Sequence, residues 1–437
     1  MTLAAACALG ACSARPAPGA RPAAALQAGT ELGRLIDGTP DLVVAGEPLN
    51  VQALRRFYAR QDFEPVWASR PLVEQALVAT VLRAGDHGLD PELFHANLLR
   101  RRETFPPLRR ELLLTDAILA YAGALAHGAM PAQRRKDFEA LMPQPVDVAE
   151  ALGAAITSQD PAAAIEALAP ATATYRGLRE ALRNQRAAGP AAGGAAANRQ
   201  RIIEANLERE RWLPRPLPAE RVWVNVPDQH LVLYRHDRPV FSTRVVVGDS
   251  SERNQSPEFN ALIEASFFNP PWIVPRDIVV AEILPKLDRD PDYLARNNMV
   301  MRANGEVEQL PGPTAGLGYI LFDMPNRFDV YLHDTPDRFL FSRSDRRMSR
   351  GCIRVQNPRE FAALLMEQPL DSIDRKIEVG GTTRSTLPKP VPVFVAYQTA
   401  FADVDGKMQF RPDFYNRDAD LWRRLQKYPQ GQALAMP

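Results

Sequence analysis

The period of the apolar residues changes once along the chain, and this change limits the folds that the chain can adopt. From about residue 30 to 185, apolar residues recur every three or four positions, as in PLVEQALVATVLRAGDHGLDPELF and LRRELLLTDAILAYAGALAH, which predicts amphipathic helices. Beyond residue 220 the period falls to two in VWVNV, HLVLYR and PVFSTRVVVG, and short turns separate these runs. We therefore expect an α+β protein, with an all-helical domain followed by a mostly-β domain.

The same patterns divide the chain into segments that differ in period and composition. The stretch AAGPAAGGAAAN has too few large apolar residues to form a core, so we interpret it as a linker. The expected segments are a leader at 1–29, a helical scaffold domain at 30–186, an Ala/Gly linker at 187–200, a mostly-β domain at 201–380 with a lid-like insertion at about 267–315, and a C-terminal strand and tail at 381–437 that pack on the mostly-β domain.

The charge balance and the N-terminal stretch indicate which partners and location to expect. With 53 Lys plus Arg against 52 Asp plus Glu, the chain lacks the basic excess of a broad nucleic-acid-binding surface, so we expect no nucleic acid partner. The first residues, MTLAAACALGACSARPAPGA, resemble the end of a secretory signal with a lipobox, in which Cys12 would be lipidated. We expect export to the periplasm and cell envelope, with membrane association through a lipid anchor. The alternative is an unstructured Ala/Pro leader.

One cysteine lies far from the N-terminus and is the first candidate for chemistry. Apart from Cys7 and Cys12, Cys352 in SRGCIRV is the only cysteine of the chain, and an unpaired thiol is a liability in an oxidising compartment. A nucleophilic thiol needs a base to take its proton. His333, at the end of DVYLH, lies 19 positions earlier, and two strand ends joined by one loop can bring the two side chains together.

The residues around Cys352 favour a nucleophile. Gly351 permits a sharp turn whose backbone amides can serve as an oxyanion hole. Arg350 and Arg354 add positive charge, which lowers a thiol pKa and attracts a carboxylate, although both could also form a solvated rim. The alternative to a catalytic pair is that His333 is a core or turn histidine with its hydrogen bonds made, and that Cys352 is a small buried apolar residue.

Other catalytic mechanisms have weaker support in the sequence. The chain has no Ser-x-x-Lys pair, no Gly-x-Ser-x-Gly elbow, and no HExxH or CxxC motif. A metal bound through His333, Asp334 and Cys352 would lack the usual ligand spacing, so we expect neither a metal nor another cofactor. In the insertion, Trp272 within PPWIVP is either part of a lid over a peptide groove or part of the insertion's own packing.

YLHDTP followed by SRGCIRV resembles the active-site signature of the L,D-transpeptidases, in which a histidine precedes a Ser/Thr-x-Gly-Cys motif. Fifteen residues separate His333 from Ser349 in this chain. The segments NLERERWLP, VNVPDQHLVLY, FNPPWIVPRDI and PVPVFVAYQTAF are similar to the larger Gram-negative branch of that family, whose catalytic domain follows a helical scaffold. The similarity covers nearly all of residues 40–420.

The resemblance implies a role for each candidate residue. Cys352 would be the nucleophile, and His333 the general base and then the acid, with its other ring nitrogen held by the backbone carbonyl of Asp334. Backbone amides near Gly351 and Cys352 would hold the oxyanion. The residues expected to bind substrate or to order the site are Arg354, Arg350, Ser349, Tyr331 and Trp272.

The implied reaction forms 3-3 cross-links in peptidoglycan. The thiol would attack the carbonyl of the third residue of a tetrapeptide stem and release the terminal D-Ala, and a second stem's amine would resolve the thioester. The implied partners are peptidoglycan stem peptides, with carbapenem-type β-lactams as covalent inhibitors. The alternatives are L,D-carboxypeptidase activity or transfer to another amine at the same site. A non-enzymatic wall-binding scaffold has the least support.

The chain departs from the family at the linker. Relatives of this size usually carry a small helical peptidoglycan-binding domain there, and AAGPAAGGAAAN is too short to form one. We therefore expect binding to whole sacculi to be weaker than in relatives. The residue between Ser349 and Gly351, often histidine in the family, is Arg350.

Overall fold

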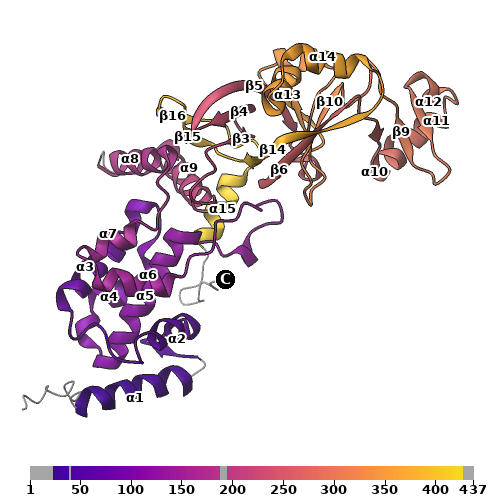
Figure 1. Cartoon of the computed structure of the whole chain (residues 1–437). Coiled ribbons are helices and arrows are strands. Elements are labelled where there is room, and N and C mark those ends of the chain that lie inside the picture. Colours follow the sequence, from indigo (N-terminus) through magenta and orange to yellow (C-terminus); the bar gives the residue numbers. More distant parts are fainter. Residues whose placement is uncertain (1–22, 39–40, 188–193, 427–437) are drawn as a thin grey trace, which may run out of the picture.

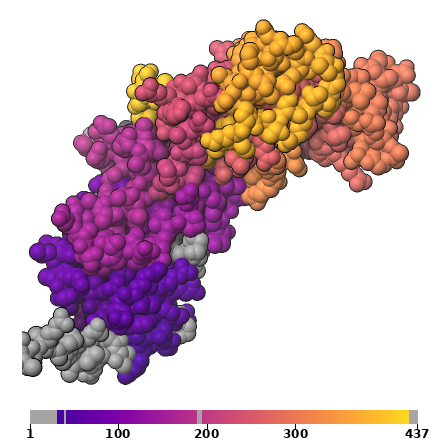
Figure 2. Space-filling view, in the orientation of Figure 1, coloured from indigo at the N-terminus to yellow at the C-terminus, as the bar shows by residue number. Residues whose placement is uncertain are grey.

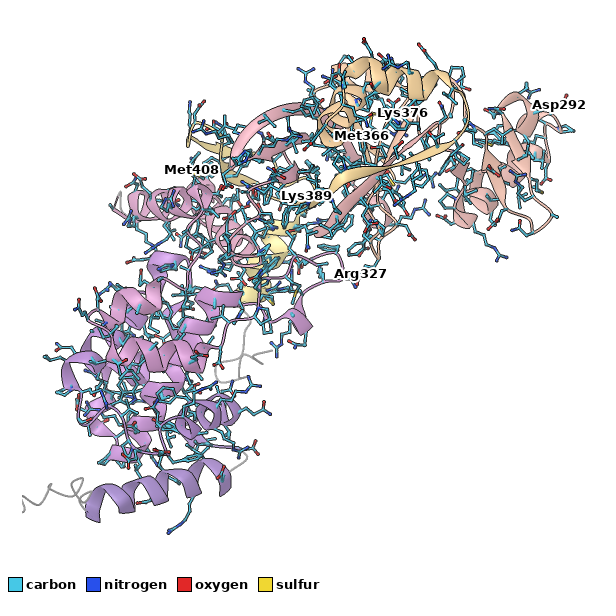
Figure 3. All side chains as sticks on the ribbon, viewed as in Figure 1. Asp292, Arg327, Met366, Lys376, Lys389 and Met408 are labelled. Atoms are coloured by element: carbon cyan, nitrogen blue, oxygen red, sulfur yellow. The ribbon has the colours of Figure 1, made fainter. Side chains whose placement is uncertain are left out.

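The chain forms an elongated molecule with helices at one end and a β-sheet towards the other. The computed structural model describes residues 23–38, 41–187 and 194–426. The helical N-terminal domain, the sheet domain and the insertion follow one another along the long axis (Figure 1). The insertion projects beyond the sheet domain at the far end (Figure 2), where Asp292 marks its outer part (Figure 3).

The N-terminal domain is built around one long helix. Helix α5 has fifteen buried residues, because its sequence is apolar on nearly every side, as expected for a helix enclosed by others. Pro107 begins this helix, and Gly128, with φ +93°, ends it. The α-helices of the domain are α1 Ala23–Gly38, α2 Val51–Ala59, α3 Pro71–Leu82, α4 Ala96–Arg100, α5 Pro107–His127, α6 Val148–Thr157, α7 Pro161–Glu166 and α8 Ala173–Ala187, with a small hairpin of β1 Val43–Val44 and β2 Glu47–Pro48.

The second domain contains a sheet that closes on itself. Its order is β12-β5-β13-β11-β10-β6-β14-β3-β4, and β4 also pairs with β5, so the long strand β5 closes the ring. Its strands are β3 Arg221–Asn225, β4 His230–Arg235, β5 Arg238–Gly248, β6 Phe259–Phe268, β10 Ile320–Asp323, β11 Leu332–His333, β12 Arg347–Ser349, β13 Ile353–Val355 and β14 Thr383–Ala396. Alternate residues point inward, and helices α13 Pro358–Met366 and α14 Leu370–Glu378 contribute Phe361 and Ile373 to the same core.

The insertion is a subdomain with its own core. Its strands β7 Trp272–Ile273, β8 Met299–Met301 and β9 Val307–Gln309 form a three-stranded sheet in the order β7-β9-β8. A continuous helical stretch combines α10 Arg276–Ile278, the π-helical η6 Val279–Ile283 and α11 Leu284–Leu287, and α12 Tyr293–Arg296 follows. The buried residues of its core are Val274, Ile278, Val279, Ile283 and Val307. The sequence predicted the short helices but not this sheet.

Two helices join the domains. Helix α9 Gly194–Arg211 is buried continuously from Ile203 to Arg211 and packs against both α8 and α15 Arg417–Gln426. Helix α15 places Leu421 and Leu425 in the core of the helical domain. The short strands β15 Ala400–Ala402 and β16 Met408–Phe410 lie beside α8.

The structure corrects three of the predicted boundaries. Helix α1 begins at Ala23, inside the expected leader, and α9 begins at Gly194, because the alanines of the expected linker favour a helix. Strand β14 lies between β6 and β3 and so belongs to the main sheet, although the prediction assigned it to a separate C-terminal segment. The tail, expected to pack on the sheet domain, contacts both domains: Arg417 binds Glu258 and the Ser256 carbonyl, whereas Leu421 and Leu425 pack in the core of the helical domain. Over the described ranges, no helix is both long and apolar enough to span a bilayer.

Candidate active site

Cys352 and His333 lie on neighbouring strands of the main sheet. Strands β11 and β13 are parallel and pair Leu332 with Ile353 and His333 with Arg354. Leu332 and Ile353 both point into the buried core, so the residues before and after them point to the opposite face. The register therefore places the Cys352 thiol and the His333 imidazole on one face of adjacent strands.

The turn before Cys352 is held by one hydroxyl group. Ser349 Oγ donates a hydrogen bond to the Cys352 carbonyl oxygen at 2.5 Å and accepts one from the Gly351 N–H at 3.2 Å. Gly351 has φ +107°, a conformation that residues with a Cβ rarely adopt. Its carbonyl oxygen accepts a hydrogen bond from Ser256 Oγ at 2.8 Å. Both sides of the turn are therefore fixed.

These contacts show how the turn is held. The Gly351 N–H is bonded to Ser349 Oγ and the residue forms the turn, while its contribution to the oxyanion hole stays a prediction. The Cys352 amide remains the candidate donor to an oxyanion. Ser349 is buried and supports the backbone of the turn, and its contact with substrate stays a prediction.

The Cys352 thiol is partly exposed and is protonated in this arrangement. Its Sγ lies 3.8 Å from the carbonyl oxygen of Asp329, and among the described residues no hydrogen bond joins it to His333. Burial raises the pKa of the Cys352 thiol, and the negative charge of Asp329 adds to this shift. The backbone N–H of Tyr331 and the positive charge of Arg354 lower the pKa, but they do not overcome the effect of burial.

His333 is buried as a neutral ring. Burial, and then the charge of Arg354, lower the pKa of His333 to about 4, although the carbonyl groups of Asp334 and Leu317 favour the protonated ring. The Nδ1 atom lies 2.5 Å from the Asp334 carbonyl oxygen. A carbonyl oxygen only accepts hydrogen bonds, so this contact favours the tautomer with the proton on Nδ1 and the lone pair on Nε2. The tautomer is the one that a general base needs.

Asp334 is itself held firmly. Its carboxylate accepts hydrogen bonds from the backbone N–H groups of Tyr319 at 2.9 Å and Thr335 at 2.7 Å, and it forms an ion pair with Arg338 at 2.7 Å. Gly318 leaves room for that carboxylate, since a Cβ at this position would lie 2.5 Å from Asp334 Cγ. Neither Gly318 nor Arg338 was predicted, because their contacts depend on how the loop folds.

The two arginines beside Cys352 have different partners. Arg354, half-buried, donates to Asp337 Oδ2 at 3.0 Å and to Thr335 Oγ1 at 3.4 Å, so it orders the loop that follows β11. Arg350 is exposed and forms an ion pair with Glu282 of the insertion. Glu282 was not predicted, because nothing in the sequence pairs two residues so far apart.

The remaining predicted residues fall in three different places. Tyr331 is half-buried and packs on the core of the main sheet, and burial followed by the negative charges of Asp329 and Asp323 raises its pKa. Trp272 packs against the insertion core, as expected if it contributes to the packing of the insertion. Cys12 lies outside the described residues. Within the described ranges, no group of three or more His, Cys, Asp or Glu side chains is arranged to hold a metal ion.

The fold and the site together define a two-domain protein whose closed β-sheet presents a cysteine and a histidine on adjacent parallel strands, behind a helical N-terminal domain. Comparison with family models identifies both parts. Residues 219–393 match the L,D-transpeptidase catalytic domain, and residues 52–182 match the Scaffold domain. The chain thus carries an L,D-transpeptidase catalytic domain behind an N-terminal scaffold domain, as the resemblance predicted.

Two individual proteins are also similar to this chain. A Haemophilus influenzae protein described as "Putative L,D-transpeptidase" is 31% identical over 238 residues, which make up 48% of each chain. The chain thus spans about half the length of this curated relative. A solved structure titled "Structure of the Ldtfm-avibactam carbamoyl enzyme" shares 13% identity with a TM-score of 0.21, over 41% of this chain and 49% of the other.

Proposed function

We propose that the protein forms 3-3 peptidoglycan cross-links through a thioester on Cys352. The observation that carries this proposal is the register of β11 and β13, which sets the thiol and the imidazole on one sheet face within the matched catalytic domain. The Asp334 carbonyl supports it further, because it holds His333 in the tautomer of a base.

The acylation step uses groups already in place. Nε2 of His333 takes the thiol proton while Sγ forms a bond to the carbonyl carbon of the third stem residue. The Cys352 amide would then donate to the oxyanion of the tetrahedral intermediate. When the intermediate collapses, the bond to D-Ala breaks, His333 returns the proton to the leaving amine, and a thioester remains.

The second step regenerates the enzyme. The side-chain amine of another stem attacks the thioester carbonyl, His333 takes a proton from that amine, and the thiolate leaves and is reprotonated. Water in place of the amine would give a shortened tripeptide, which is the L,D-carboxypeptidase alternative. A different amine would give a different conjugate from the same thioester.

Products made from disaccharide tetrapeptides test the assignment. We expect 3-3 linked dimers and free D-Ala by mass spectrometry, and the loss of both in Cys352→Ala. A carbapenem should add its mass to the wild-type chain but not to this variant, and an adduct on the variant would refute Cys352 as the nucleophile. Tripeptides without dimers would support the carboxypeptidase instead.

We further propose that the chain acts in the periplasm, held by a lipid on Cys12. The LGAC stretch supports this proposal, since it matches the residues that precede a lipidated cysteine. Blocking lipoprotein signal processing in cells should leave a larger precursor. An unchanged size, or an unchanged product in Cys12→Ala, would count against the anchor.

A further inference from the structure

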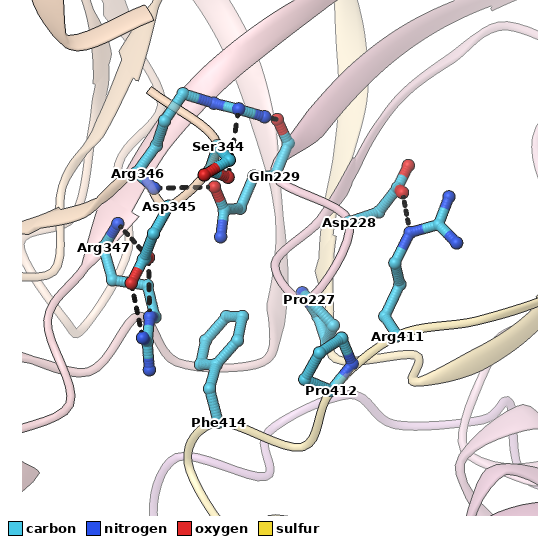
Figure 4. A pocket seen from close by; sticks show the side chains of 10 residues that line it. All are labelled: Pro227, Asp228, Gln229, Ser344, Asp345, Arg346, Arg347, Arg411, Pro412 and Phe414. Atoms are coloured by element: carbon cyan, nitrogen blue, oxygen red, sulfur yellow. Dashed lines mark hydrogen bonds and ion pairs between the residues drawn. The ribbon is translucent and has the colours of Figure 1, made fainter. Parts of the chain in front are cut away.

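A pocket away from the Cys352 thiol lies where three segments of the chain meet. It has a volume of about 340 Å³ and is formed by the β3–β4 turn, the segment before β12 and the segment after β16 (Figure 4). This volume is within the range of small-molecule sites. None of its lining residues belongs to the candidate active site, so a ligand for this pocket has to be inferred separately.

Gln229 supplies a fixed hydrogen-bond donor to this pocket. Its backbone is in the left-handed region at φ +53°, which is uncommon for a residue other than glycine. Its Oε1 accepts the Arg346 N–H at 2.9 Å, and its carbonyl oxygen accepts from Val245 N at 2.9 Å and Arg346 Nη2 at 3.1 Å. Gln229 is 7% exposed, and its side-chain nitrogen points into the pocket, towards Phe414 (Figure 4).

Only the side-chain amide nitrogen of Gln229 is therefore available to bind a ligand. Of its side-chain atoms, Oε1 is used within the protein, whereas the amide nitrogen has no partner among the described residues. The backbone of Gln229 and its Oε1 are held in place by these hydrogen bonds, in a backbone conformation that is uncommon outside glycine. The donor can hold a carbonyl or hydroxyl oxygen of a bound molecule without any rearrangement.

The walls of the pocket are apolar and its rim is charged but paired. The ring of Phe414 and the rings of Pro227 and Pro412 form the walls. On one side of the rim, Arg347 Nε donates to Asp345 at 2.7 Å. On the other side, Arg411 Nε donates to Asp228 at 2.6 Å.

This pairing decides which ligands fit. Each rim arginine is neutralised by a carboxylate, and the guanidinium of Arg346 is bound to backbone carbonyl groups, so the pocket lacks the free cations that hold a phosphate. An apolar ring surface beside planar carboxylates, guanidinium groups and an amide suits a ligand with an apolar face and many hydroxyl groups.

We propose that the pocket binds one sugar unit of a glycan, with its C–H face against the apolar wall of Phe414, Pro227 and Pro412 and an amide carbonyl or hydroxyl oxygen on the Gln229 nitrogen. The Arg347 guanidinium carbon lies over the Phe414 ring, 4.9 Å from its centroid, so the sugar would use the part of the ring that Arg347 leaves open. The rim carboxylates would accept from the remaining hydroxyl groups. An N-acetylated hexose meets every part of this description. The site goes beyond the proposed transfer of stem peptides, and it requires no chemistry at Cys352.

The chain path connects this pocket to the candidate active site. Arg347 on the rim is the first residue of β12, and Ser349, which holds the Cys352 turn, is the last. Cys352 lies five positions after Arg347 along the chain, so their Cα atoms are at most about 18 Å apart.

Binding of chitotetraose, an N-acetylglucosamine oligomer without peptide, tests the proposal. Saturation-transfer NMR and calorimetry are carried out on the full chain with Cys352→Ala, so that catalysis plays no part. We expect binding, with an affinity about tenfold lower in Gln229→Glu, which keeps the acceptor for Arg346 and removes the donor. Phe414→Leu should weaken binding similarly, because it removes the ring face.

Controls separate the outcomes. Phe339→Leu changes a phenylalanine outside the pocket that is 63% exposed, and it should bind chitotetraose like the parent. Melting temperatures identify any variant that fails to fold. No binding by a folded parent, or equal binding by parent and both pocket variants, would overturn the proposal. Binding of a free tetrapeptide that Gln229→Glu weakens would make this a peptide pocket. Each result is independent of whether Cys352 forms a thioester.

Discussion

At the scale of single residues, the candidate pair is neutral rather than ionic. Burial raises the pKa of Cys352, while burial and Arg354 lower the pKa of His333 to about 4, so thiol and free imidazole coexist at neutral pH. Proton transfer would then accompany attack on the substrate, instead of preceding it. A partly exposed thiol that is mostly protonated is also protected from oxidation, which suits a protein expected in an oxidising compartment.

This neutral pair predicts the pH dependence of acylation. Because His333 is unprotonated above about pH 4, carbapenem acylation should change little between pH 5.5 and 7.5 and should fall as the pH approaches 4. Intact mass against time measures the rate, and Cys352→Ala, which should stay unmodified, is the control. A rise of about tenfold per pH unit between 5.5 and 7.5 would instead show that reaction requires prior formation of a thiolate.

At the scale of secondary-structure elements, the insertion touches the catalytic turn through one ion pair. Glu282 in η6 holds Arg350, and both side chains are well exposed. An exposed pair contributes only about 0–1 kcal/mol to stability, so substrate can displace it at small cost. Arg350 is thus either held by the insertion or free to meet a carboxylate of the stem peptide.

Removing the carboxylate tests this exchange. In Glu282→Gln, Arg350 loses its competitor, and we expect KM for a tetrapeptide substrate to fall a few-fold while the melting temperature stays close to the parent value. Arg350→Gln should raise KM. Glu306→Gln, an exposed change elsewhere in the insertion, is the matched control. If both changes at the pair shift KM in the same direction, Arg350 does not exchange between the two partners.

The sequence predicted those features that depend on local patterns. The period of the apolar residues indicated the helical and mostly-β domains, and the strand ends at His333 and Cys352 indicated that the two residues lie near each other in the sheet. The sheet of the insertion was missed because its strands have two or three residues, too few to show a period. The contacts of Ser349 and of Glu282 were missed because a hydroxyl or a carboxylate has no preferred partner until the chain has folded.

At the scale of the whole molecule, the two domains are joined through buried polar groups. Glu210 of α9 is fully enclosed and accepts hydrogen bonds from Thr172, just before α8, and from Gln398, just after β14. It thereby links the helical domain, the joining helix and the main sheet. Arg327, on the lower side of the sheet domain (Figure 3), adds a peripheral link through an ion pair with Asp137 at 2.8 Å.

Glu210 makes the stability of this junction depend on pH. Burial raises the pKa of Glu210 to about 7, above its value in the unfolded chain. Between those two pH values the folded protein holds a proton that the unfolded chain has released. Stability is therefore highest below the unfolded pKa and falls as the pH rises towards 7.

Glu210→Gln removes this titration and keeps both hydrogen bonds, because an amide can accept from Gln398 and donate to Thr172. We expect parent and variant to melt together near pH 4, and the variant to be more stable by on the order of 3 kcal/mol at pH 8, since each pKa unit is worth about 1.36 kcal/mol. Calorimetry and hydrogen exchange of the α9 amides measure the difference. Glu180→Gln, at an exposed position of α8, controls for the loss of charge. A constant gap between parent and Glu210→Gln from pH 4 to 8 would mean that Glu210 is ionised in the folded protein throughout, and that the junction relies on its charge instead of its proton.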